Sequence, residues 1–342
     1  MTKVRSTFCR AIAPAVVALF AAGGHAQPDQ TVLPPFGGGV NPGTKFMTTH
    51  AQPQGGALVS FKSSQDDASE LSINGVLFKP AGAARGAVVI VNSADGWSDV
   101  REGHYARSIS SAGYAVLAID TFGPRGIKEA STDNTRITTY EQAREAFAAK
   151  RYLVSLGYPA DRIAVMGADR GGTIALLAAD RTYMQKAKEE RFAVAIAVGP
   201  ACFLHPRQPK PSASVFIAIG DRNQVTGVKP CEDLANEYAA AGGKSTVKVY
   251  AGATSGFDGD PALRVMYRYV ATETFADCNV VVEPDGRSVY QGKTFEETDS
   301  SALFLEMRKS CVRRGASGYT NVTQKANVTL DLIDFLDANL PR

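Results

Sequence analysis

The stretch "AVMGADRGGTIALLAA", from Ala164 to Ala179, decides the fold. Its first apolar residues are typical of a buried strand, and an apolar helix follows a group of glycines. The turn between them fits the pattern Gly-x-nucleophile-x-Gly, with Gly167 and Gly171 on either side of Asp169. Small residues are needed there because strand and helix pack closely across such a turn. Asp169 thus stands where a hydrolase normally presents serine or cysteine. A plain glycine-rich turn, with Asp169 paired to a nearby arginine, is the alternative interpretation.

Strands and helices alternate on both sides of this stretch. Short apolar runs predict buried strands at residues 86–92, 114–120, 162–167, 192–199, 214–220 and 246–252. Helical patterns follow at residues 100–112, 138–156, 171–180, 230–242 and 327–340. Two earlier strands, at 57–63 and 70–80, predict an antiparallel opening pair. Together these patterns predict an α/β fold with a mostly parallel central sheet and helices on both faces.

Polar residues follow two of the later strands. Asp221 comes after the strand at 214–220, in "GDRNQVTG", and Ser255 comes after the strand at 246–252, in "ATSGFDGD". Ligand sites in open parallel sheets lie at the carboxyl ends of the strands, so we expect both residues near Asp169. The chain order nucleophile, acid, histidine is that of the α/β hydrolases. Asp169 and Asp221 occupy the first two positions, but serine stands at the third.

A family resemblance becomes specific at this point. The segments that carry it are "AIDTFGPRG" (118–126), "RIAVMG" with its turn, "GPAC" (199–202), the loop leading to "PCEDLA" and "YAGATSGFD" (250–258). The chain resembles the dienelactone hydrolase family, especially its exported members, from about Val88 to Asp258 and again in the last helix. The resemblance implies the α/β-hydrolase fold. It also implies Asp169 at the nucleophile position, Asp221 as the acid, and Ser255 at the position of the histidine.

The resemblance implies further site residues. The backbone N–H groups of Ala94 and Arg170 correspond to the oxyanion hole, which no side-chain change removes. Arg125 lies near the position of an arginine that contacts the substrate carboxylate in the family, with a structural ion pair as the alternative. Trp97 is expected either to line the rim of the same pocket or to cap the sheet.

An aspartate at the turn permits two kinds of chemistry. Asp169 could act as a nucleophile, forming an alkyl ester, or as a general base on water. Ser255 is not a base at neutral pH, so we consider His104 and His205, which follow strands at the same edge, as a relocated base. Both could equally be exposed or structural histidines. A Ca²⁺ site from the oxygens of Asp169, Asp221 and Ser255 is a further alternative.

The sequence predicts neither a metal site nor a cofactor. It contains no zinc-like Cys/His spacing, no Walker loop and no dinucleotide fingerprint. We therefore expect a site built from protein groups alone, with a small-molecule substrate or ligand that is anionic if Arg125 binds it.

Residues 1–26 are predicted to be a signal peptide, because a basic start precedes a short apolar run and the small residues of a cleavage site at Ala26. A membrane anchor is the alternative, although the run is short for a span. Three of the 37 basic residues and none of the 34 acidic ones lie in this segment, so the remaining chain is formally neutral. Nothing therefore suggests nucleic-acid binding.

The rest of the chain is expected to comprise a Pro/Gly-rich arm at 27–57 and a hydrolase domain at 58–342, with a polar, loop-rich insertion at about 258–325. Four cysteines remain after the signal, an even number that suggests two disulfides in a periplasmic or secreted protein. The preferred pairs are Cys202 with Cys231 and Cys278 with Cys311; four buried thiols are the alternative. The sequence contains no pattern that predicts the oligomeric state.

Two functions follow from these residues. The first is a dienelactone-hydrolase-like enzyme that acts on a small ester or lactone with an altered triad. The second is a pseudo-hydrolase that binds a small ligand or a protein partner without turnover. The turn at Asp169 and the loop expected to form the oxyanion hole match the family's pattern and favour the first function. The serine at the histidine position favours the second.

Overall fold

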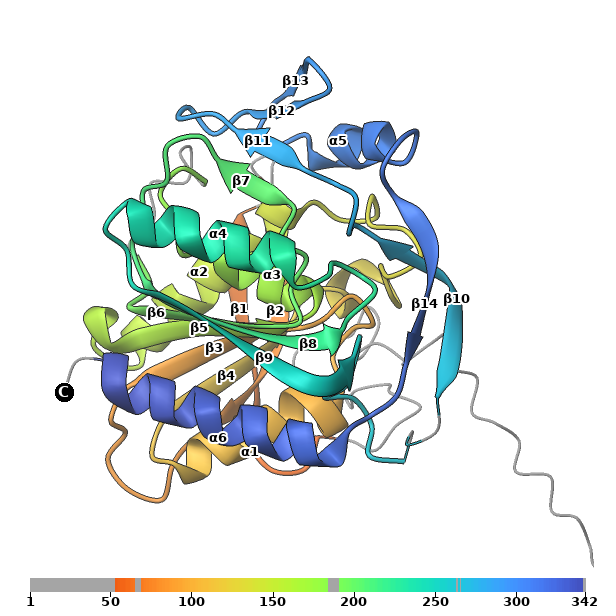
Figure 1. The fold of residues 1–342 in the computed structure, drawn as a ribbon. Helices are drawn as coiled ribbons and strands as arrows, with labels where there is room; N and C mark the ends of the chain where they lie inside the picture. Colours follow the sequence, from red (N-terminus) through yellow and green to blue (C-terminus); the bar gives the residue numbers. More distant parts are fainter. Residues whose placement is uncertain (1–52, 65–68, 184–190, 263, 265, 341–342) are drawn as a thin grey trace, which may run out of the picture. The chain divides into compact units, whose positions relative to one another are not determined.

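The computed structural model describes residues 53–64, 69–183, 191–262, 264 and 266–340. Its core is an eight-stranded sheet (Figure 1). In sheet order the strands are β1 (Ala57–Ser64), β2 (Glu70–Phe78), β4 (Ala115–Asp120), β3 (Ala87–Val91), β5 (Ile163–Ala168), β6 (Val194–Val198), β8 (Ser214–Arg222) and β9 (Ser245–Thr254). β1 and β2 pair antiparallel, which confirms the expected opening pair, and β2 joins β4 in the same sense. From β4 to β9 all neighbours are parallel.

Helices cover both faces of this sheet, as predicted (Figure 1). On one face lie α1 (His104–Ser111) and α6 (Val322–Asn339). On the other lie α2 (Thr139–Ser155), α3 (Arg170–Leu177) and α4 (Lys229–Ala240). Three short helical turns complete the connections: η1 (Asp99–Gly103), η2 (Gly123–Arg125) and η3 (Ala160–Arg162).

The two-sided cover explains why the parallel strands read as continuous apolar runs. In β3, Val89 and Val91 pack into the core that holds α2 and α3, whereas Val88 and Ile90 pack into the core that holds α1 and α6. Successive side chains of a strand point to opposite faces, so a strand between two helical layers buries every residue. All five residues of β3 are buried.

The insertion is more regular than the loop-rich segment expected from its sequence. It contains β10 (Tyr267–Thr274), β11 (Val280–Val282), β12 (Ser288–Tyr290), β13 (Lys293–Phe295), α5 (Ser300–Met307) and β14 (Arg313–Gly318). β10 pairs with β14, while β13, β12 and β11 extend a small sheet from β7 (Leu204–Pro206). The prediction failed because β11, β12 and β13 have only three residues each, and the partner of β10, the strand β14, lies far along the chain.

Both expected disulfides are present, Cys202–Cys231 and Cys278–Cys311, with S–S distances of 2.09 and 2.00 Å. The second connects the segment after β10 to the segment before β14 and so closes the insertion on itself.

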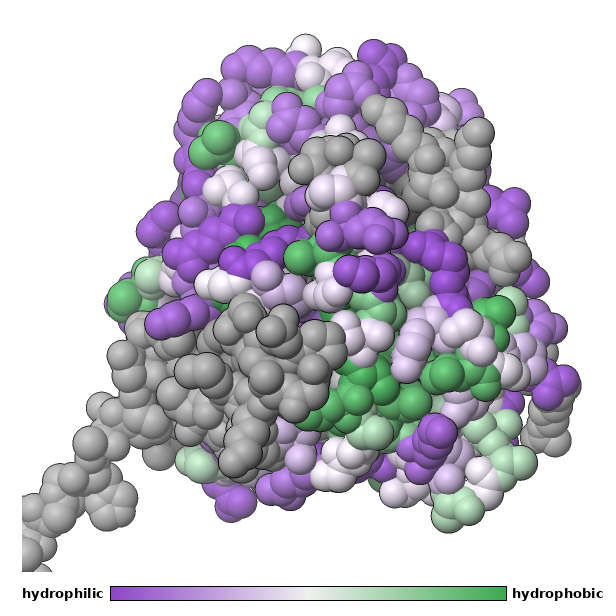
Figure 2. Space-filling model, turned by 180° about the vertical axis from the view of Figure 1, so that it is seen from behind, coloured by the Kyte–Doolittle hydropathy of each residue, from purple (hydrophilic) through white to green (hydrophobic). Residues whose placement is uncertain are grey.

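The predicted signal peptide and most of the predicted arm lie outside the described residues. Within the described part, no helix is both long and apolar enough to cross a membrane. The face opposite to that of Figure 1 carries an apolar area among polar ones (Figure 2).

Candidate active site

Asp169 lies at the sharp turn between β5 and α3, with φ 51° and ψ −120°. A positive φ is unusual for a residue other than glycine, and such strain is common at functional sites. The flanking glycines make the turn sterically feasible. A Cβ on Gly167 would lie 2.2 Å from the backbone of Gly171, and a Cβ on Gly171 would lie 2.3 Å from the carbonyl oxygen of Val91. The turn therefore has the close approach and the strained centre of a nucleophile elbow.

The carboxylate of Asp169 is held by the two backbone groups expected to form the oxyanion hole. The N–H of Ala94, in the loop after β3, donates to Oδ2 of Asp169 at 3.1 Å. The backbone N–H of Arg170 also stabilises the ionised carboxylate. Two N–H donors that converge on one point can stabilise a developing anion. In this structure they stabilise the protein's own carboxylate.

The surroundings raise the pKa of Asp169 to about 6. Burial is the main cause, because it removes water from the charged form, and the neighbouring carboxylate of Asp95 adds to the effect. Arg101 and the two backbone N–H groups oppose it. A carboxylate with a pKa near 6 is mostly ionised at neutral pH and is a stronger base than an exposed aspartate.

Asp221 is not the acid of this site, contrary to the expectation from sequence. β8 continues to Arg222, so Asp221 still belongs to the strand, and its exposed carboxylate accepts a hydrogen bond from the N–H of Gly252 at 2.8 Å. The residue that faces Ser255 is Asn223, whose Oδ1 accepts from the hydroxyl of Ser255 at 2.9 Å. The strand was predicted to end at Gly220, two residues too early, and this placed the acid position too early as well.

Asn223 and Ser255 are therefore the side chains that meet at the carboxyl ends of β8 and β9. The hydroxyl of Ser255 also accepts from the N–H of Gln224 at 3.1 Å, so its donor and acceptor capacities are both used. Asn223 also accepts from the N–H of Val225 at 2.8 Å, in a local turn of the kind that asparagine favours. Neither side chain is a base at neutral pH. The sequence signal that could have identified Asn223 is an asparagine, a residue that favours turns, shortly after a buried strand.

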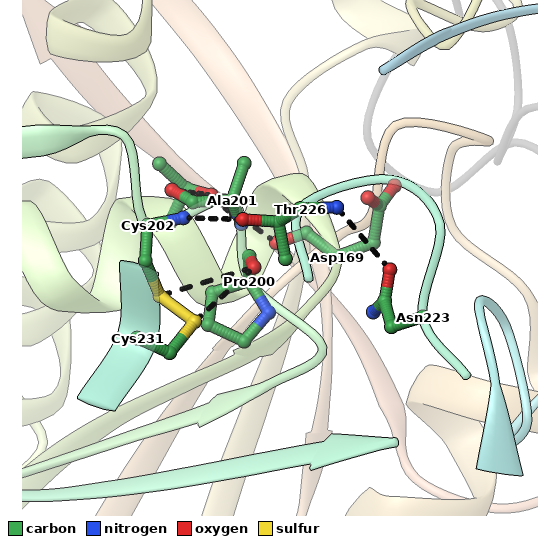
Figure 3. The surroundings of a disulfide bond; sticks show 8 residues. Asp169, Pro200, Ala201, Cys202, Asn223, Thr226 and Cys231 are labelled. Carbon is green, nitrogen blue, oxygen red and sulfur yellow. Dashed lines mark hydrogen bonds between the residues drawn. A yellow bond between two sulfur atoms is a disulfide. The ribbon is translucent and has the colours of Figure 1, made fainter. Parts of the chain in front are cut away.

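The disulfide Cys202–Cys231 supports the loop that carries Asn223. The N–H of Cys202 donates to the hydroxyl of Thr226 at 3.1 Å, and the N–H of Thr226 donates to Oδ1 of Asn223 at 3.3 Å. Figure 3 shows this chain of contacts, with Asp169 and Asn223 extending from loops at the same edge of the sheet. The disulfide thus lies directly behind the site.

Neither histidine considered as a relocated base lies in the site. Nε2 of His104 is 3.2 Å from the hydroxyl of Thr329 in α6, and burial lowers the pKa of His104 to about 4. Nδ1 of His205, in β7, is 3.0 Å from a carboxylate oxygen of Glu237 in α4. Both are structural histidines, because the helices packed against them supply their partners.

Arg125 and Trp97 also have structural surroundings instead of the expected contacts with substrate. The guanidinium of Arg125 lies 2.5 Å from the buried carboxylate of Glu145 and donates to the carbonyl oxygen of Thr121 at 2.8 Å. Trp97 is fully buried in the core beneath α1 and α6. The expectation of an arginine ready for an anionic substrate is therefore wrong, and the ion-pair alternative is correct.

A narrow pocket opens beside Asp169, with a cavity volume of about 30 Å³. This is room for about two water molecules. Three phenylalanines form its apolar wall: Phe203, Phe275 and Phe304. Polar groups lie opposite them, including Arg170 and Glu273. Two of the phenylalanines and Glu273 come from the insertion, so the insertion closes the pocket over the sheet edge.

Sequence reasoning missed a buried polar network that joins the insertion to the elbow. Glu273 of β10 is fully buried and accepts from Nδ2 of Asn134 at 2.9 Å and from Nε of Arg308 at 2.5 Å. Oδ1 of Asn134 accepts from the guanidinium of Arg170 at 2.7 Å. The guanidinium of Arg170 also donates to Gln142 and to the carbonyl oxygen of Ile137. The members are far apart in sequence, and no local pattern reveals them.

The alternative of a Ca²⁺ site from Asp169, Asp221 and Ser255 is not assembled, because Asp221 binds Gly252 and Ser255 binds Asn223. Among the described residues, no group of three or more histidines, cysteines, aspartates and glutamates is arranged to hold a metal ion.

Comparison with known proteins gives one family match. The model described as "Dienelactone hydrolase family" matches residues 73–276, a segment that includes Ala94, Asp169, Asn223 and Ser255. Similar solved structures include the apo form of Thermogutta terrifontis esterase 2 (16% identity, 60% of this chain and 87% of that chain, TM-score 0.48). Another is a putative dienelactone hydrolase from Klebsiella pneumoniae subsp. pneumoniae (15% identity, 59% and 88%, TM-score 0.45). No curated protein sequence matches.

Proposed function

Since the chain belongs to the dienelactone hydrolase family and has its α/β-hydrolase fold, we propose that it hydrolyses a small ester or lactone with Asp169 as a general base. In this proposal Asp169 removes a proton from a water molecule in the pocket, and the water attacks the substrate carbonyl. The bond from the carbonyl carbon to the leaving oxygen then breaks, and Asp169 returns the proton to that oxygen. No covalent intermediate is needed, so the chemistry does not require the histidine that the site lacks.

The observation that carries this proposal is the elevated pKa of Asp169, about 6, beside a cavity with room for water. A general base is most effective when its pKa lies near the working pH. The strained backbone at Asp169 supports the same interpretation, because the fold holds this carboxylate in a conformation that non-glycine residues rarely adopt. The N–H of Ala94 would stabilise the developing oxyanion once the substrate oxygen replaces Oδ2 of Asp169.

We propose a neutral small molecule as the substrate. Asp169 and Glu273 place two carboxyl groups in the pocket wall, and Arg125 is already paired with Glu145. Arg170, the cation among the residues that line the pocket, already donates to Asn134, Gln142 and Ile137, so an anionic substrate would find no free cation there.

A second candidate function is favoured by the Ser255–Asn223 pair. These two side chains satisfy each other at 2.9 Å and offer no proton acceptor comparable to imidazole. A pseudo-hydrolase that binds a small ligand or a protein partner without turnover would keep the fold and lose this base.

The test compares wild type with Asp169→Asn on p-nitrophenyl acetate and a small lactone. We expect kcat/KM of the wild type to rise with pH through about 6, as Asp169 ionises, and to fall at least about 100-fold in the variant. Asp221→Asn is the matched control, because it removes an exposed carboxylate at the same sheet edge, and it should keep wild-type activity. Equal activity in wild type and Asp169→Asn would refute the role of Asp169. Absence of turnover in every protein would favour the second candidate.

We also propose that the protein is exported to the periplasm or secreted. The basic and apolar start of the chain supports this, with cleavage after Ala26, and so do the two disulfides, which persist in oxidising compartments. N-terminal sequencing of the protein from the extracytoplasmic fraction would test the cleavage site.

A further inference from the structure

Asp169 holds one carboxylate oxygen in the position where a substrate oxyanion is normally stabilised. We infer that Asp169 is arranged to take an alkyl group from a small neutral electrophile, such as a primary alkyl halide, by displacement at a saturated carbon. The inference rests on the proposed role of Asp169 as the reacting group, but it does not require the hydrolysis of esters. We expect the resulting ester on Asp169 to accumulate, because Ser255 and Asn223, the described side chains at the positions expected to supply a base, do not accept a proton at neutral pH.

The first support is the hydrogen bond from the N–H of Ala94 to Oδ2 of Asp169, at 3.1 Å, together with the backbone N–H of Arg170. Attack on an ester carbonyl generates an oxyanion that needs these donors. Displacement at a saturated carbon generates no oxyanion on the substrate, so it proceeds while Oδ2 keeps its donors. The resting arrangement thus suits alkyl transfer better than acyl transfer.

The reaction balances without a further reactant. Oδ1 of the ionised Asp169 forms a bond to carbon, the carbon–halogen bond breaks, and its electron pair leaves with the halide ion. One anion replaces another, and no proton moves. Carboxylates of aspartate and glutamate are established nucleophiles of this covalent kind.

The fate of the ester follows from Asn223 and Ser255. Hydrolysis at Cγ of Asp169 would place negative charge on Oδ2, which already accepts from Ala94, so the electrostatic requirement of this second step is met. The attacking water also needs a base. Ser255 and Asn223 bind each other at the positions that would supply one, and neither accepts a proton at neutral pH. The ester therefore persists.

The pocket limits the electrophile. A cavity of about 30 Å³, which has room for about two water molecules, admits only the smallest electrophiles beside its phenylalanine wall, such as one that carries a methyl or ethyl group. Arg170, the cation among the residues that line the pocket, already donates to Asn134, Gln142 and Ile137, so the pocket offers no free cation to an anionic electrophile such as a haloacetate.

The test incubates the purified full-length protein with bromoethane at pH 8 and follows intact mass and peptide masses. Cys9, the cysteine outside both disulfides, is replaced by serine in every protein so that its thiol does not react. We expect one ethyl group on wild type, located on Asp169, and none at this position in Asp169→Asn. Asp221→Asn, the matched control, should be labelled like wild type. Unlabelled wild type, or labelling spread equally over Asp221 and other exposed carboxylates, would overturn the inference.

A second measurement tests why the ester persists. The variant Asn223→Asp/Ser255→His places an acid and a base behind Asp169, and we expect it to release more than one equivalent of bromide per protein while the wild type stops at one. An ester equally long-lived in the variant would refute the role assigned to these two positions. If Asp169 is labelled but p-nitrophenyl acetate is not hydrolysed, this inference is upheld and the proposed ester hydrolysis is refuted. If p-nitrophenyl acetate is hydrolysed but Asp169 is not labelled, ester hydrolysis is upheld and this inference is refuted.

Discussion

At the scale of single residues, Asp169 is a functional group that the fold holds at an energetic cost. Its pKa in the folded protein, about 6, lies above the ordinary value of 3.8 for an aspartate. A carboxyl group whose pKa is raised on folding stabilises the protein at low pH, and this contribution is lost as pH rises through the folded pKa. Ionised Asp169 therefore destabilises the protein at neutral pH.

We accordingly predict that Asp169→Asn raises stability at pH 8, by at most about 3 kcal/mol from the shift in pKa. Asparagine retains an oxygen that can accept from Ala94 but carries no charge. The gain should shrink as pH falls through 6 and vanish below about 4, where both forms are neutral. Thermal melts across this pH range provide the measurement, and a pH-independent gain would contradict the electrostatic explanation.

In contrast to Asp169, the charge of Arg125 stabilises the folded protein. The carboxylate of Glu145 is fully buried, and burial raises its pKa to about 7 although Arg125 opposes the effect. We predict that Arg125→Ala destabilises the protein by about 3 kcal/mol or more, because it leaves a buried carboxylate without its cation. Lys229→Ala is the control: it breaks an exposed pair with Asp233 and should leave the denaturation midpoint almost unchanged. Chemical denaturation distinguishes the two, and equal effects would refute a structural role for Arg125.

At the scale of elements, the unit β5–elbow–α3 depends on close backbone approach. Gly171 lies against the end of β3, where a Cβ would be 2.3 Å from the carbonyl oxygen of Val91. The same strand continues into the loop that presents Ala94. The packing of one helix against one strand thus determines the distance between Asp169 and its backbone donor.

Gly171→Ala should therefore destabilise the protein by about 2–3 kcal/mol, the range for forcing an extra methyl group into packed structure. Gly82→Ala is the matched control, since a Cβ there meets nothing within 4 Å. Urea denaturation measures both. If Gly171→Ala is as stable as the control, the elbow is looser than its geometry implies.

At the scale of the whole molecule, the insertion completes the pocket. It supplies Phe275, Phe304 and Glu273, and Glu273 connects through Asn134 to Arg170 at the start of α3. Its buried apolar side chains pack into the core that also holds α2 and α3, and the disulfide Cys278–Cys311 adds a covalent link within the insertion.

Replacing both cysteines of this disulfide with serine should lower stability by about 3–4 kcal/mol, as expected for a cross-link between residues 33 apart. The main reason is that the disulfide reduces the conformational entropy of the unfolded chain, and the variant regains this entropy. Guanidinium denaturation of the variant and of the wild type under oxidising conditions tests the value. An unchanged midpoint would show that the β10–β14 pair and the buried network hold the insertion without the cross-link.

Local pattern determined much of this protein. Period and apolar content located every strand of the main sheet, and Gly167 and Gly171 located the elbow, because these signals depend on neighbours within a few residues. The alternation of strands and helices then determined that most strands of the sheet are parallel, and at which edge of the sheet the site lies. The even cysteine count, together with their places along the chain, led to the disulfide pairs found in the structure.

Only the tertiary structure decided which side chains meet. It put Asn223 rather than Asp221 opposite Ser255, paired Arg125 with Glu145, turned both histidines away from the site and brought Glu273 into the pocket. Some of these contacts join residues that are more than a hundred positions apart in the sequence. The two residues by which β8 extends beyond its predicted end change which side chain faces the site. The sequence determined where a site must be; the geometry of packed elements determined that its carboxylate fills its own oxyanion hole.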